Sequence, residues 1–97
     1  MTGPVAIGHV LFAFPMTSSL KKAERNAVDA GLKVWKVSKP DMMDNLFKGL
    51  LDALSGVVYL DDKQICHLEG PVDKVYAEIP RIEIELWEMG HNIELIC

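Results

Sequence analysis

Apolar and polar positions alternate along the chain in short segments, each with the period of a strand or of a helix. Nearly continuous apolar residues over 6–14, closed by Pro15, predict a central strand buried on both faces. Residues 20–30 have a narrow apolar face, hydroxyl residues before it and Gly31 after it, which predicts a helix. Residues 32–38 alternate with period two, as in a short edge strand or an extended connection.

The middle of the chain predicts the main core helix and then a hairpin. Ser38-Lys39-Pro40-Asp41 has the spacing of a capping box with proline in the first turn, so a helix should begin there. After it, apolar residues at 57–60 and 64–68 flank a polar turn at 61–63, which predicts two antiparallel strands. The helix's apolar stripe recurs every three or four residues and contains Met42, Met43, Leu46, Phe47, Leu50, Leu51 and Leu54.

The last third of the chain fits two periodicities. Gly70 and Pro71 predict the start of a helix over 71–79, because proline's missing N–H is harmless in a first turn. Beyond Pro80, residues 82–89 fit both the period of a strand and a helical spacing that continues across the proline. We favour a helix kinked near Pro80, because the chain must cross back to the sheet before a last strand over 93–96.

These elements assemble into an α+β fold. Their order predicts a ferredoxin-like βαββαβ sandwich, with an antiparallel or mixed sheet and the helices on one face. A length of 97 residues fits one domain over 1–97. The apolar ending Glu94-Leu95-Ile96-Cys97 suggests that the chain is a fragment of a longer one.

Composition and charge narrow the expected partners. Hydrophobic residues make up 49% and charged residues 25%, as in ordinary globular proteins. The net charge is −4 and the longest basic cluster is Lys21-Lys22, which argues against nucleic acid as a partner. No segment resembles a signal peptide or a membrane span. The two cysteines, Cys66 and Cys97, form no disulfide framework, so a cytoplasmic, reducing location is expected.

The hairpin and its flanks resemble a known family. Three segments carry the resemblance: 54–59 with Leu-Ser-Gly, 64–71 ending in Leu68-Glu69-Gly70-Pro71, and 91–95. Over about residues 50–97 the chain is similar to the BLUF domains, flavin-binding blue-light sensors. The resemblance implies a ferredoxin-like fold and an FAD site. In that family, a tyrosine on the first strand, a glutamine on the third and an asparagine on the helix before the hairpin surround the flavin.

The flavin-contacting residues of that family are absent at the matching positions. Phe14 stands for the tyrosine, Gly49 for the asparagine and Cys66, beside His67, for the glutamine. A phenylalanine has no O–H, and a thiol is a weak donor and acceptor, so the hydrogen-bond network could not switch. We therefore predict no cofactor and no catalytic residue. The chain is also similar to BLUF-like proteins of ciliated and sperm cells, which lack the flavin residues.

No other site chemistry is predicted. The chain has no closely spaced Cys or His pair to nucleate a metal site, so no metal is expected. Trp35 and Trp87, each in a charged context, are the candidate interface residues, and the alternative role for both, which we favour, is partial burial in the core.

The resulting hypothesis is a non-catalytic module that binds other protein subunits. It would be a structural subunit of a large intracellular assembly such as a ciliary axoneme or another cytoskeletal structure. The alternative is a flavin-binding blue-light sensor or regulatory domain with FAD. A small enzyme of the acylphosphatase kind ranks last, because the chain lacks a glycine-rich anion loop with an arginine.

Overall fold

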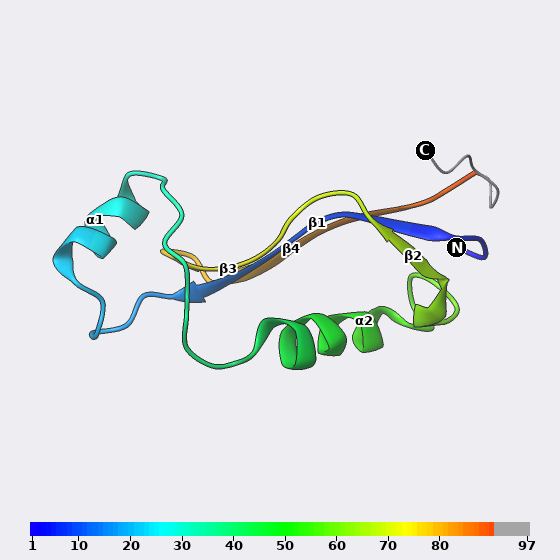
Figure 1. Cartoon of the computed structure of the whole chain (residues 1–97), viewed down its shortest axis with the longest axis horizontal. Coiled ribbons are helices and arrows are strands. Elements are labelled where there is room, and N and C mark those ends of the chain that lie inside the picture. The colour runs from blue at the N-terminus through cyan, green and yellow to red at the C-terminus, as the bar shows by residue number, and fades with distance from the viewer. Residues whose placement is uncertain (91–97) are drawn as a thin grey trace.

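The structure, a computed structural model, describes residues 1–90 and shows a small α+β protein with a four-stranded mixed sheet and two α-helices (Figure 1). The α+β class and the mixed sheet are as predicted. The strands are β1 (Val5–Pro15), β2 (Ile65–Leu68), β3 (Val72–Ala77) and β4 (Arg81–Glu88). The helices are α1 (Lys22–Asp29) and α2 (Lys48–Leu54), with a π-helical segment η1 (Met42–Phe47) directly before α2 and a 3-10 turn η2 (Asp62–Gln64) before β2.

Strand β1 is the centre of the sheet, as its continuous apolar run predicts. It pairs with β4 in the antiparallel direction along one side and with β2 and β3 in the parallel direction along the other. Val5, Ile7, Val10 and Phe12 are each at most 2% exposed. A strand covered by neighbours on both edges and by side chains on its faces needs this uniformly apolar sequence.

Strands β2 and β3 follow the same side of β1 and are separated by residues 69–71. The Val10 N–H donates to the Pro71 carbonyl at 3.0 Å, so the backbone stays beside β1 through the break. A Cβ on Gly70 would lie 2.0 Å from the Gly8 carbonyl oxygen, so only glycine allows this approach. Leu-Glu-Gly-Pro is therefore an interruption between two strands, and the helix predicted from Pro71 is wrong.

The second half of the chain contains strands where helices were predicted. The segment predicted as a helix over 71–79 contains β3, and the kinked helix over 82–89 is replaced by β4, for which the period-two alternative holds. The long apolar edge of β1 explains the outcome, because Ile84 of β4 pairs opposite Val10. The ferredoxin-like order is therefore not the order observed in residues 1–90.

The predicted hairpin is also different from the structure. Residues 57–60 form a turn joined by a single bridge between Ser55 and Tyr59, and only the second predicted strand exists, as β2. Residues 32–38 are an extended connection that bridges β3 once, at Trp35 and Val75. The strand predicted over 93–96 lies outside the described residues.

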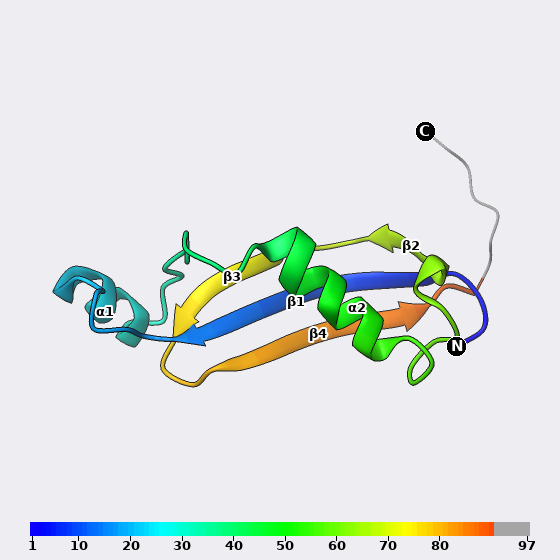
Figure 2. The ribbon, with the colours of Figure 1, turned by 90° about the horizontal axis from the view of Figure 1, so that it is seen from below.

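Segment η1–α2 (Met42–Leu54) covers one face of the sheet (Figure 2). Phe47 is 7% exposed and packs with Ile7, Val10 and Phe12 of β1. Leu46, Leu50 and Leu51 pack against the same cluster, so the predicted core helix exists. It begins at Met42, however, and the capping box predicted at Ser38 is not formed. Helix α1 buries no residue and lies beyond the end of β1 (Figure 1).

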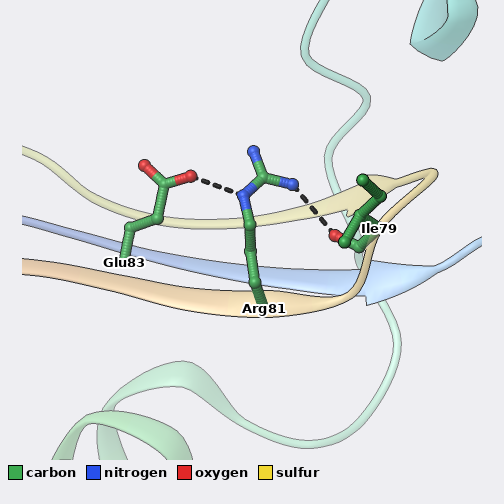
Figure 3. A network of polar contacts seen from close by, with 3 residues as sticks. All are labelled: Ile79, Arg81 and Glu83. Carbon is green, nitrogen blue, oxygen red and sulfur yellow. Dashed lines mark hydrogen bonds and ion pairs between the residues drawn. The ribbon is translucent and has the colours of Figure 1, made fainter.

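The sheet has charged side chains on the side away from η1–α2. Figure 3 shows Arg81 and Glu83 of β4 extending from the strand on the side opposite the green helical ribbon. The Arg81 Nε pairs with the Glu83 carboxylate, and Nη1 donates to the Ile79 carbonyl at 2.9 Å. No helix among residues 1–90 has the length and apolar character needed to span a membrane.

Candidate functional site

Aspartates are concentrated in the segment from η1 to η2. Five of them fall between residues 41 and 62. Asp52 lies near the end of α2, and Asp61 and Asp62 lie at the start of η2, where the chain turns towards β2. The charges of Asp52 and Asp61 both act on Asp62, so residues from two elements form one group of carboxylates. We call Asp52, Asp61 and Asp62 the acidic cluster.

The two aspartates of the turn ionise differently. The Lys63 N–H donates to Asp61 Oδ1 at 3.0 Å, and this bond, with a hydrogen bond from Asp62, holds the pKa of Asp61 below its ordinary value. The hydrogen bond to Asp61 raises the pKa of Asp62, and partial loss of hydration and the negative charges of Asp61 and Asp52 act in the same direction. The two neighbouring carboxyl groups therefore have pKa values shifted in opposite directions.

Tyr59 connects the two elements that carry the acidic cluster. Its side chain is 2% exposed, and its hydroxyl donates to the Leu51 carbonyl in α2 at 2.7 Å. Burial raises the pKa of Tyr59, and the charges of Asp62, Asp52 and Asp61 raise it further. The phenol therefore stays protonated and keeps donating its hydrogen bond to α2 near Asp52.

The remaining aspartates of the segment, Asp41 and Asp44, lie at the opposite end of η1–α2. Both are exposed, as are Asn45 and Lys48. The connection that leads into Asp41 is held by Lys74 of β3, whose Nζ donates to the carbonyls of Ser38 and, at 2.8 Å, Pro40. The helical segment thus has acidic residues at both ends, with Lys48 between them.

The acidic cluster has the composition of a site for proton transfer. A carboxylic acid and a carboxylate with separated pKa values can act as general acid and general base. Within residues 1–90, no group of three or more His, Cys, Asp or Glu side chains is arranged to hold a metal ion. The three aspartates influence one another's ionisation, but they do not converge on one point.

The residues matched to a flavin site do not come together. Phe14 lies near the end of β1, with the Lys36 Nζ 5.2 Å from its ring centre, and Gly49 is exposed on α2. Cys66 and His67 are exposed on β2, which pairs with the beginning of β1. These positions lie at opposite ends of the central strand and form no common site.

Trp35 and Trp87 both remain accessible. Trp35 is 55% exposed beside Lys33, whose Nζ lies 5.6 Å from the ring centre, and Trp87 is 37% exposed at the end of β4. Trp87 also covers Gly8, where an added Cβ would lie 2.7 Å from the indole. Their role as interface residues stays a prediction.

Interpretation of the sequence missed the acidic cluster because it placed Asp61 and Asp62 in a polar turn and singled out no aspartate of the predicted core helix. The available signal was the number of aspartates within 22 residues, counted from 41 to 62, with Asn45 and Lys48 on the same helical segment. Solvated helix faces usually pair acidic with basic residues, and here the acidic residues are in excess.

Comparisons with known proteins identify a different family from the one that the hairpin resembles. A family model described as "Endodeoxyribonuclease RusA" matches residues 1–87. A protein of Bacillus subtilis (strain 168) named "Uncharacterized protein YqaN" is 36% identical over 91 residues, which are 93% of this chain. The chain spans 61% of the length of that relative. No solved structure matches the chain.

These matches correct four predictions. The assignment to the BLUF family is wrong, because the family model covers nearly the whole chain and not the hairpin alone. The family consists of DNA-cleaving enzymes, so the predicted non-catalytic structural or ciliary subunit, the expectation that it is not an enzyme and the exclusion of nucleic acid are also wrong. The exclusion of nucleic acid rested on the net charge, which does not show where the charges are located. The chain belongs to the RusA endodeoxyribonuclease family.

Proposed function

We propose that the chain carries the endodeoxyribonuclease activity of its family and cleaves phosphodiester bonds at Holliday junctions, with the acidic cluster at the reaction centre. The observation that carries this proposal is the meeting of Asp52 from α2 with Asp61 and Asp62 from η2, beside the buried Tyr59. Three neighbouring carboxylates repel one another, and such an arrangement is typical of sites that do chemistry.

The chemistry of the cluster fits hydrolysis. A water oxygen forms a bond to phosphorus, the bond from phosphorus to the leaving sugar oxygen breaks, and a proton moves from the water side to the leaving side. Asp61, which its lowered pKa keeps ionised, is the group that accepts a proton from water. Asp62, with its raised pKa, is the group that donates one to the leaving oxygen.

Metal ions are common in nucleases, where carboxylates hold them. The carboxylates described in residues 1–90 do not fit such a group as they stand, because no three of them are arranged around one point. The proposal therefore routes no step through a metal, and the cleavage assay includes Mg²⁺ as a variable.

Cations near the cluster offset the repulsion between DNA phosphates and carboxylates. Lys63 follows Asp62 directly in η2. Lys48 lies four residues before Asp52, so Lys48 and Asp52 are on the same side of α2. Both lysines are exposed. They can contact the phosphates on either side of the scissile bond, as basic residues do in DNA complexes.

The test is cleavage of a labelled four-way junction, with linear duplex of the same sequence as the substrate control, with and without Mg²⁺. We expect Asp61→Asn and Asp62→Asn each to lower kcat by roughly 100-fold or more. Asparagine keeps the capping bond at position 61, so the fold should be retained. The matched control is Asp29→Asn in α1, an exposed aspartate outside the cluster, which should stay within about twofold of the wild type.

Two outcomes would overturn the proposal. One is wild-type protein that cleaves neither the junction nor the duplex under any of these conditions. The other is cleavage that survives Asp61→Asn and Asp62→Asn but is lost in Asp41→Asn or Asp44→Asn, which would move the reaction centre to the other end of η1–α2.

A further inference from the structure

The side chain of Gln64 uses its full hydrogen-bonding capacity at the edge of the acidic cluster. Its Oε1 accepts from the backbone N–H groups of Leu60 and Asp61 at 2.7 and 2.9 Å. Its Nε2 donates to the carbonyls of Met1 and Gly3 at 3.2 and 2.9 Å. A primary amide has two acceptor lone pairs and two donor hydrogens, so no capacity is left for a substrate.

These four bonds connect the turn that carries Asp61 to the segment that leads into β1. The same segment is held from the other side by Glu88 of β4, whose Oε2 accepts from the Thr2 and Gly3 N–H groups at 2.6 and 2.8 Å. The backbone of the turn is therefore connected to the sheet through Gln64, residues 1–3 and Glu88.

The Gln64 bonds hold the backbone of the turn at the point where the two aspartates begin. The Leu60 and Asp61 N–H groups lie directly before the two aspartates, and the Asp61 carboxylate itself accepts from Lys63. Asp52 is placed by α2, and the Tyr59 bond to the Leu51 carbonyl connects α2 to the chain two residues before Asp61. The relative position of the two halves of the cluster thus depends on how firmly the turn is held.

We propose that Gln64 is a positioning residue of the cleavage site, which holds Asp61 and Asp62 opposite Asp52 through its bonds to the turn and to residues 1–3. This inference rests on the proposed function, because it assigns Gln64 a role for those carboxylates. Because its amide oxygen and nitrogen are used within the protein, Gln64 has no polar group free to bind DNA. It differs from a core residue because it is half-buried and outside the apolar cluster of the sheet.

Substitutions at 64 separate this role from general stability. Gln64→Met keeps the length and removes all four bonds. Gln64→Glu keeps one acceptor oxygen and places the second carboxylate oxygen against the Met1 and Gly3 carbonyls, which repel it. The control is Val75→Ala, a buried residue of β3 that lowers stability without touching the turn.

The measurements are junction cleavage well below the melting temperature, and hydrogen exchange of single backbone amides by NMR. In both Gln64 variants we expect kcat to fall roughly 10- to 100-fold, KM to change less than about twofold, and the Leu60 and Asp61 amides to exchange at least about tenfold faster. Val75→Ala should lower the melting temperature as much or more and keep kcat within about twofold.

The outcomes distinguish this inference from the proposed function. Wild-type protein that cleaves no DNA overturns the proposed function and the positioning role with it. Active wild type with unchanged kcat in Gln64→Met overturns the positioning role alone, and so does a loss of kcat that Val75→Ala reproduces at equal loss of melting temperature.

Discussion

The two helical segments of this protein, α1 and η1–α2, differ in how they pack against the sheet. Each has an apolar side and a charged side, yet α1 buries no residue, whereas η1–α2 buries Phe47 against β1. Of the two segments, only η1–α2 carries a residue of the acidic cluster, Asp52. The difference indicates that a charged helix face gains a fixed position, and with it the ability to form a site, from what its apolar face contacts.

Removal of Phe47 should have the largest effect on this comparison. Phe47→Ala removes a 7% exposed ring from the cluster with Ile7, Val10 and Phe12 and should lower the free energy of unfolding by about 3 kcal/mol. Val28→Ala in α1, which is half-buried, should cost less than about 1 kcal/mol. Urea denaturation followed by circular dichroism measures both. Equal losses would show that α1 is packed as firmly as η1–α2.

Loss of the Tyr59 hydroxyl should have an intermediate effect. Tyr59→Phe keeps the ring in the core and removes the bond to the Leu51 carbonyl, for a loss of about 1 kcal/mol in the free energy of unfolding. Amide exchange should accelerate at the end of α2 and leave α1 unchanged. Uniform acceleration over both helices would contradict a local link between Tyr59 and α2.

A stabilising substitution at Gly49 tests the same difference in packing between α2 and α1. Gly49 has a helical backbone, and an added Cβ meets nothing within 4 Å, so Gly49→Ala should raise the free energy of unfolding by about 0.5–1 kcal/mol. The reverse change in α1, Ala23→Gly, should shift the global midpoint by less than about 0.5 kcal/mol, because α1 can fray without exposing the core. Thermal melts of the two variants are the measurement, and a larger shift from Ala23→Gly would reverse our ranking of the helices.

The smallest expected effect is the pH dependence of stability that comes from Glu88, the last residue of β4. Hydrogen bonds from the Gly3 and Thr2 N–H groups hold the pKa of Glu88 below its ordinary value. A lowered carboxyl pKa stabilises the folded state above the unfolded-state pKa, and the contribution is lost as pH falls through the folded-state pKa. Glu88→Gln should therefore melt slightly lower than wild type at pH 7, and the two melting curves should converge in acid. A difference that grows towards acid pH would contradict this assignment.

The sequence was sufficient for elements whose pattern fits one period and insufficient where two periods fit. The uninterrupted apolar run of β1 and the long stripe from Met42 to Leu54 each allow one interpretation, and both are found in the structure. Residues 82–86 alternate as a strand but also extend a helical spacing, and the available edge of β1 decided the outcome. Tertiary pairing of this kind is not visible in a local pattern.

Local sequence patterns could not predict the candidate site, for a similar reason. Asp52 and Asp61 belong to different elements, and their proximity depends on the turn over 57–60 and on the Tyr59 contact with Leu51. A motif of four residues, Leu68-Glu69-Gly70-Pro71, suggested the wrong family. In this chain its glycine is required by the close approach of the Gly8 carbonyl, which the motif alone does not reveal.

The central position of β1 has a consequence for how the chain folds. Within residues 1–90, β2, β3 and β4 each pair with β1 and none of them pairs with another, so Val10 must meet both Val72 and Ile84. Strand β1 is synthesised first, but the strands that pair with it lie far along the chain, between Ile65 and Glu88. Such long sequence separations slow folding and leave an apolar strand exposed in the meantime. The whole sheet should consequently assemble in one late, cooperative step.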